Sequence, residues 1–186
     1  MVSHTSFGLL LSVICCLLAP RLSYSEDLSL QSLSIRARVS EKTILGEDAS
    51  EDFEEYAVSA NFGLPWKRNF TSGWRMDTLL MASAGTLRGA GETALVVSLI
   101  PKLTLESEDR GVTLDLGVGG ALFSRHRFGS QDFGGSYQFA LTLGVDVPLY
   151  NNLRLGYRFL HYSDASVHGS DTTGADFHMI EFIYRL

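Results

Sequence analysis

Three residues near the end of the chain have the types and spacing that ester hydrolysis requires. His161 and Ser163 lie two apart at the end of one predicted strand, and Asp176 lies near the start of the next. Residues two apart in a strand share a face, with Cβ atoms roughly 6 to 7 Å apart, a gap that a rotated imidazole can close. A nucleophile, a base that takes its proton and an acid that orients the base form a hydrolytic triad. We therefore predict Ser163 as nucleophile, His161 as base and Asp176 as acid, provided that the strand register places Asp176 opposite His161.

The face that carries these three residues is otherwise apolar. In the first strand His161 and Ser163 continue a series of large apolar side chains, and in the second Asp176 leads into another: Leu155, Tyr157, Phe159, Ile180, Phe182 and Tyr184. The opposite parity of the same strands is charged and carries Arg154, Arg158, Glu181 and Arg185. Reactive groups on the apolar side favour a wall that faces lipid, and a lipid as the substrate.

Each of these residues also has a simpler interpretation when taken alone. A His-x-Ser pair is frequent by chance, and Ser163 and Asp176 could merely border a loop. The three together, on one face and at one rim, favour the catalytic interpretation. His178 shares the face of Asp176 and is the rival base, whereas His168 lies in the loop and is expected to be solvated. The series Arg125, His126 and Arg127 fits either lipid phosphates or, more simply, a charged loop tip.

The beginning of the chain predicts export. Residues 1–25 read as a signal peptide, because Gly8 to Leu18 is apolar but too short to span a bilayer and small residues precede Glu26. Both cysteines lie inside this segment, so residues 26–186 are expected to form a single domain without disulfides. Loss of Arg21 with the signal leaves 14 basic against 21 acidic residues, a net charge of −7. An acidic chain argues against nucleic acid as a partner.

Alternating apolar and polar residues predict eight strands. The first six cover about Leu30 to Val39, Tyr56 to Leu64, Trp74 to Gly85, Ala94 to Leu105, Val112 to Leu122 and Tyr137 to Val147, and the last two lie within Leu153 to Leu186. Pro65 is expected to end the second strand, Glu47 to Glu55 to form a solvated acidic loop, and Ser124 to Gly135 to form a long polar loop.

An even number of strands, joined by alternately long and short connections in an exported chain, predicts an all-β fold: an eight-stranded antiparallel transmembrane β-barrel of the outer membrane. A barrel of this size is only wide enough inside for side chains to fill it. The charged residues at the inward-facing positions therefore predict a packed polar core and no pore. With a periplasmic N-terminus, the rim that carries His161, Ser163 and Asp176 faces the outside of the cell, among the lipids of the outer leaflet.

Two other classes of function compete with a lipid hydrolase. A structural or adhesive barrel would work through its loops, and the short to moderate loops argue mildly against it. A soluble barrel that binds an apolar ligand inside, as lipocalins do, is disfavoured because the predicted interior is ionic.

With these residues in place, the chain resembles the lipid A 3-O-deacylase (PagL) family of outer-membrane barrels. The resemblance covers roughly Val96 to Leu186 and is strongest in Leu116 to Ser124 and in His161 to Ala165. It implies hydrolysis of the acyl chain at position 3 of lipid A, without metal or cofactor, with His161 as general base, Ser163 as nucleophile and Asp176 as orienting acid. The implied partner is lipopolysaccharide of the outer leaflet, and the sequence leaves open whether the barrel is a monomer or a homodimer.

The sequence departs from the family at three positions. Asp176 stands where the family usually has Glu, and Asp164 and Ser166 stand where it has Asn and Gly. The resemblance associates Asp164 and Ser166 with the oxyanion hole. A carboxylate directed at a developing oxyanion would oppose catalysis, whereas a backbone N–H from the same residue would not. The direction of the Asp164 side chain therefore decides between an active and a degenerate enzyme.

Overall fold

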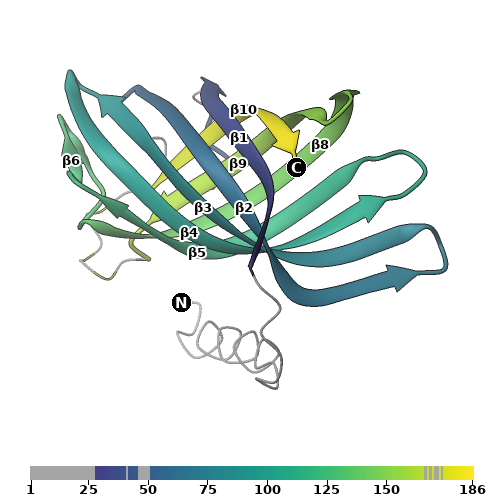
Figure 1. Cartoon of the computed structure of the whole chain (residues 1–186). Helices are drawn as coiled ribbons and strands as arrows, with labels where there is room; N and C mark the ends of the chain where they lie inside the picture. Colours follow the sequence, from purple (N-terminus) through teal and green to yellow (C-terminus); the bar gives the residue numbers. More distant parts are fainter. Residues whose placement is uncertain are drawn as a thin grey trace.

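The structure is a computed structural model that describes residues 28–40, 42–45, 51–165, 167, 169, 172 and 174–186, so the predicted signal peptide and residues Ser166 and His168 lie outside the described residues. Eight of the described strands close into one antiparallel barrel in the order β1-β10-β9-β8-β5-β4-β3-β2 (Figure 1). These are β1 (Ser29–Ser40), β2 (Phe53–Phe70), β3 (Trp74–Gly89), β4 (Glu92–Ser107), β5 (Thr113–Phe123), β8 (Tyr137–Tyr150), β9 (Leu153–Ser163) and β10 (Ala175–Arg185). The predicted fold class is confirmed.

The first and last strands close the barrel. β1 pairs with β10 so that Arg36 lies opposite Glu181, and every other neighbour in the barrel is also the next barrel strand in the chain. The β1–β2, β3–β4, β5–β8 and β9–β10 connections therefore lie at one end, called here the loop end. The β2–β3, β4–β5 and β8–β9 turns lie at the other, the turn end.

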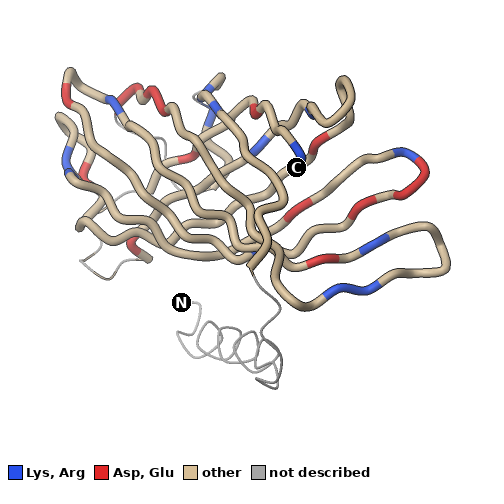
Figure 2. Tube along the Cα trace, viewed as in Figure 1, with Lys and Arg blue, Asp and Glu red and all other residues tan. Residues whose placement is uncertain are grey.

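The wall of the barrel is apolar on the outside and largely polar on the inside. Along β4 the burial alternates residue by residue, with Leu95, Val97 and Leu99 between 48% and 64% exposed while Ser98 and Lys102 are buried. Charged residues gather at the two ends of the barrel, and the wall between them carries few (Figure 2). Among the residues described, no helix is long and apolar enough to cross a membrane. The outward apolar band is the surface that a membrane-spanning barrel presents to lipid.

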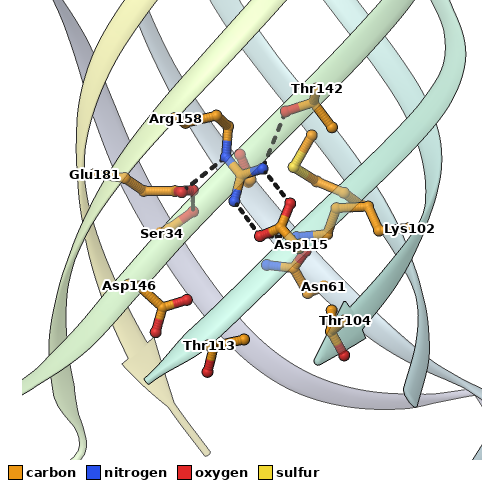
Figure 3. A network of polar contacts seen from close by, with 12 residues as sticks. Ser34, Asn61, Lys102, Thr104, Thr113, Asp115, Thr142, Asp146, Arg158 and Glu181 are labelled. Carbon is orange, nitrogen blue, oxygen red and sulfur yellow. Dashed lines mark hydrogen bonds and ion pairs between the residues drawn. The ribbon is translucent and has the colours of Figure 1, made fainter. Parts of the chain in front are cut away.

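A network of ion pairs fills the middle of the lumen (Figure 3). Arg158 donates to both oxygens of Asp115 at 2.7 and 3.0 Å, to Glu181 at 2.9 Å and to Thr142 at 3.0 Å. Lys102, which sequence reasoning did not single out, lies 3.4 Å from Asp115. Since each charge of this network lies beside one of opposite sign, the middle of the lumen is a compensated polar core, as the charged residues at the inward-facing positions predicted.

We predict that Arg158→Ala strongly destabilises the barrel. The substitution leaves Glu181 and Asp115 buried with too few positive partners, and removing one side of a buried pair typically costs about 3–5 kcal/mol. Urea unfolding in detergent micelles, followed by tryptophan fluorescence, measures the loss. Arg127→Ala is the matched control: its side chain is 72% exposed and, among the described residues, pairs with Asp132 alone, so its loss is expected to cost less than about 1 kcal/mol. Equal effects of the two substitutions would contradict the role of the network.

The loop end of the lumen is apolar, which the sequence analysis did not predict. Aromatic rings from four strands and from the β5–β8 connection pack in edge-to-face and tilted pairs with centroids 5.1 to 6.1 Å apart: Phe53, Phe123, Phe128, Phe133, Tyr162 and Phe177. Glu55, expected in a solvated loop, lies in β2 with 1% exposure and accepts from the Tyr162 hydroxyl at 3.3 Å. The prediction of a polar core is therefore wrong for this half of the lumen.

Two further predictions about the strands are wrong. β2 continues past Pro65 to Phe70, because the pairing with β3 shifts between Gly63 and Lys67 and Pro65 falls in that irregularity, where no ladder hydrogen bond from it is needed. The β5–β8 connection is not a plain polar loop but contains a short hairpin, β6 (Arg127–Phe128) and β7 (Gln131–Asp132). The long β2–β3 and β4–β5 hairpins extend beyond the rest of the barrel at the turn end (Figure 1).

Candidate active site

β9 and β10 are adjacent strands that place the three predicted residues on the outside of the barrel wall. On β9, Leu160 and Tyr162 are fully buried in the lumen, so His161 and Ser163 point away from it. The pairing of the two strands sets Asp176 directly opposite His161. The register that the sequence could only assume is therefore present.

His161 and Asp176 form a close pair. Nδ1 of His161 lies 2.6 Å from Oδ1 of Asp176, and the two side chains are 17% and 1% exposed. An ionised carboxylate can only accept a hydrogen bond, so Nδ1–H is the donor and Nε2 carries the free lone pair. A base in this tautomer, held by an acid, can take a proton from a hydroxyl.

Ser163 is on the same face as His161 but is not yet bonded to it. Ser163 ends β9 and is half-buried, with Phe139 of β8 as its partner across the sheet. Within the described part of the chain, no hydrogen bond joins the Ser163 hydroxyl to the imidazole. Nucleophile–base contacts are often looser before substrate binds. For catalysis the Ser163 hydroxyl would have to come within hydrogen-bond distance of Nε2 when substrate binds.

Gly174, just before β10, is packed against this pair, a feature that sequence reasoning missed. A Cβ atom added to it would lie 2.6 Å from the Tyr162 carbonyl oxygen, 3.0 Å from Cε1 of His161 and 3.1 Å from Cβ of Ser163. The first of these contacts is with backbone and cannot be relieved by turning a side chain. Only glycine lets the returning chain pass this close to the site.

We predict that Gly174→Ala lowers esterase activity without unfolding the barrel. The added methyl displaces the His161 ring and the backbone beside Ser163, and misplacement of reacting groups by about 1 Å can cost about 100-fold in rate. Rates of ester cleavage in detergent micelles measure the effect. Gly169→Ala is the matched control, because a Cβ at Gly169 meets nothing within 4 Å. Its φ of 118° does carry backbone strain, so the folded fraction of both variants is compared first.

The side chain of Asp164 is held by the loops at this end of the barrel. Asp164 is 6% exposed, and Thr172 Oγ1 donates to its Oδ1 at 3.0 Å. Its other oxygen packs against Gly134, where an added Cβ would lie only 2.5 Å away. The chain then turns, with Ala165 at a φ of 54° and the Val167 N–H donating to the Asp164 carbonyl. The carboxylate is thus bound to the loops, and Ser166, the other residue associated with an oxyanion hole, lies outside the described residues.

The rival residues are occupied by other contacts. Both ring nitrogens of His178 are engaged, Nε2 with the carbonyl oxygen of Lys42 at 2.7 Å and Nδ1 with the Tyr157 hydroxyl. Arg125 pairs with Glu92 at 2.7 Å. His126 and Arg127 both lie within 3.2 Å of Asp132, so the three loop residues considered for lipid phosphates already contact acids.

Two hydrogen bonds join the β5–β8 and β1–β2 connections at the loop end. Ser130, in the β6–β7 hairpin, donates from its backbone N–H and its hydroxyl to Glu51 of the β1–β2 connection, at 2.9 and 2.7 Å. These hydrogen bonds lower the pKa of the Glu51 carboxyl. The hairpin is thereby fixed above the aromatic layer of the lumen.

A closed eight-stranded barrel with an apolar outer wall and a histidine–acid pair on that wall defines an outer-membrane barrel enzyme. Comparison with known proteins specifies it further: residues 54–185 match the family described as Lipid A 3-O-deacylase (PagL). The chain belongs to this family of ester-hydrolysing outer-membrane enzymes, and the match begins earlier in the chain than the sequence resemblance did.

Individual proteins agree with this assignment. The lipid A deacylase PagL of Bordetella bronchiseptica is 27% identical over 135 residues, which cover 69% of this chain and 75% of that protein. The crystal structure of the outer membrane enzyme PagL superposes with a TM-score of 0.68 at 20% identity, covering 83% of this chain and 99% of that one. At this identity the superposition establishes the shared fold.

Proposed function

We propose that the protein hydrolyses the 3-O-linked acyl ester of lipid A from within the outer leaflet, with Ser163 as nucleophile, His161 as general base and Asp176 as orienting acid. The observation that carries the proposal is the 2.6 Å contact between His161 and Asp176 on the outer wall, beside Ser163. A hydrolytic pair on a lipid-facing surface needs a substrate whose ester bond lies in the bilayer. Lipid A has such a bond, and the family to which the chain belongs is described by that substrate.

The proposed reaction follows from the free lone pair on Nε2 of His161. Nε2 of His161 takes the proton of Ser163 as the hydroxyl oxygen attacks the ester carbonyl. The imidazolium then returns the proton to the departing sugar oxygen, leaving an acyl group on Ser163 and a free 3-hydroxyl on the sugar. Water, deprotonated by the same nitrogen, attacks the acyl-enzyme, and the carboxylic acid leaves with Ser163 restored. Asp176 stays ionised throughout and stabilises the imidazolium.

The position of Asp164 supports an active enzyme. Oδ1 of Asp164 accepts a hydrogen bond from Thr172 and its Oδ2 packs against Gly134, so the loops hold the carboxylate. Any contribution of Asp164 to an oxyanion hole would then come from its backbone N–H, a neutral donor suited to a developing negative charge.

Mass spectrometry of lipid A tests the proposal. Cells whose lipid A carries the 3-O-acyl group are compared with and without the protein, and we expect the protein to reduce the lipid A mass by one 3-hydroxyacyl group at position 3. His161→Ala, expressed to the same level and inserted in the outer membrane, is expected to leave the mass unchanged. Intact lipid A in the presence of folded wild-type protein would refute the proposal and favour a structural or adhesive barrel.

A further inference from the structure

The carboxylate of Asp176 accepts more hydrogen bonds than the one from His161. Its Oδ2 accepts the backbone N–H groups of Ile44 at 2.6 Å and Leu45 at 2.7 Å. Both belong to residues 42–45, here called the cover segment, which follow β1 and lie over the outside of β10. An outward-pointing acid on this wall would otherwise face hydrocarbon or water, yet the Asp176 side chain is only 1% exposed. The cover segment therefore accounts for the burial of the acid.

His178 attaches the cover segment to the barrel wall. It lies two residues after Asp176 on the same face of β10 and is 5% exposed. Its Nε2 lies 2.7 Å from the carbonyl oxygen of Lys42, which can only accept, so Nε2–H is the donor. In that tautomer Nδ1 accepts from the Tyr157 hydroxyl, and the ring packs against Phe159 with centroids 5.4 Å apart. Tyr157 and Phe159 of the wall therefore fix the tautomer and the position of the His178 ring.

These contacts form one continuous series from the wall to the base. Tyr157 orients His178, His178 holds Lys42, the next residues of the cover segment donate to Asp176, and Asp176 holds His161. We propose that His178 is a positioning residue that fixes the cover segment over Asp176 and so sets the orientation of the His161 ring. The inference rests on the proposed function, because it assigns His178 a role in the same reaction.

The geometry separates this role from that of a rival base. Ser163 pairs with β8, and on β9 it lies four residues beyond Phe159, the residue opposite His178. His178 has no ring nitrogen left for a serine hydroxyl, whereas His161 has Nε2. A positioning residue acts through hydrogen bonds that another side chain can imitate, but a base cannot be replaced by an amide.

Two matched pairs of variants test the inference in detergent micelles containing 3-O-acylated lipid A. His178→Leu removes the donor to Lys42, whereas His178→Gln keeps an N–H donor and a carbonyl acceptor. Ile44→Pro removes one amide from Asp176, whereas Ile44→Ala keeps it and truncates a side chain that is 61% exposed. We expect His178→Leu and Ile44→Pro to lose about 10- to 100-fold in kcat with little change in KM. The Gln and Ala variants should stay within about threefold of the wild type.

The orientation of His161 can also be read without any turnover. In protein labelled with ¹⁵N at histidine, the Nδ1–H proton of His161 should resonate far downfield because of its short bond to Asp176. We expect this resonance to shift upfield or broaden in His178→Leu and Ile44→Pro but not in their controls. This readout would move only if the acid and base lose their mutual orientation, not through a loss of stability alone.

The outcomes are distinct. Loss in the Leu and Pro variants with rescue in the Gln and Ala variants supports the inference. Abolished activity in both His178→Leu and His178→Gln would make His178 the base and overturn it. Unchanged kcat and an unchanged His161 resonance in His178→Leu would also overturn it. A folded wild-type barrel that releases no fatty acid would refute the proposed function, and the resonance would still decide whether His178 positions the pair.

Discussion

Replacing Ser163 with alanine is expected to lower release of the 3-hydroxy fatty acid by at least about 10³-fold while the barrel remains folded. The substitution removes the Ser163 hydroxyl, which lies on the same face of β9 as His161, and no acyl-enzyme can form without it. Because the Ser163 side chain makes no hydrogen bond with His161 in the free protein, its loss should leave the pair of His161 and Asp176 intact. The rate of fatty acid release from purified lipid A, measured by mass spectrometry, gives the effect.

Ser130→Ala is the matched control for this variant. It removes a hydroxyl from the same end of the barrel, where Ser130 contacts Glu51 and not the site. Its activity is expected to equal that of the wild type within about twofold, since a surface substitution usually has a small effect. Activity in Ser163→Ala comparable with the control would show that the nucleophile is a different group.

Asp176→Asn is expected to reduce kcat by about 10³- to 10⁴-fold despite its almost identical shape. The amide groups of Ile44 and Leu45 donate to Oδ2 and will keep the Asn oxygen on their side. The Asn NH₂ then faces Nδ1 of His161, which must become an acceptor. Nε2 thereby carries the proton and cannot take one from Ser163. Initial rates with lipid A in micelles measure this loss.

Asp176→Glu provides the comparison for the tautomer argument. It keeps a carboxylate, so it should retain more activity than Asp176→Asn even though the longer side chain disturbs the contact with the cover segment. The ¹⁵N shifts of His161 give an independent check, because the protonated nitrogen should change from Nδ1 to Nε2 only in the Asn variant. An Asn variant within tenfold of the wild type would contradict the orienting role of Asp176.

Much of the fold could be predicted because alternation is a strong signal in a barrel. Each strand separates an apolar outer face from a polar inner one, so parity alone placed Arg158 and Glu181 inside and His161 outside. The same signal misled at prolines. Pro65 was expected to end its strand, but an irregularity in the pairing with β3 accommodates it, and such irregularities depend on the neighbouring strand.

The aromatic layer was missed for a different reason. Phe128 and Phe133 lie in a segment whose composition is polar, and they are buried only because the short β6–β7 hairpin folds over the lumen. No periodicity marks two phenylalanines in a loop as core residues. Their burial is a consequence of contacts between loops that are distant in the sequence.

The three residues of the candidate site could be proposed from the sequence, but the neighbouring groups that hold them in place could not. Spacing and parity predicted that His161, Ser163 and Asp176 share one face of the wall, but the cover segment lies more than 130 residues from Asp176 in the chain and contributes backbone N–H groups. Backbone donors leave no trace in residue types. Gly174 gives no sequence signal either, because its importance lies in the space that it leaves to His161.

The aromatic layer also controls how solvent reaches the reaction. Leu160 and Tyr162, the lumen neighbours of His161 and Ser163 on β9, are fully buried, so these side chains close the wall behind the site to bulk solvent. In the proposed mechanism, the water that releases the acid from Ser163 would therefore arrive along the outer surface, from the headgroup layer at the rim. Hydrolysis should consequently slow when that layer is dehydrated or tightly packed, while the acid so formed can escape sideways among the lipid chains without crossing the protein.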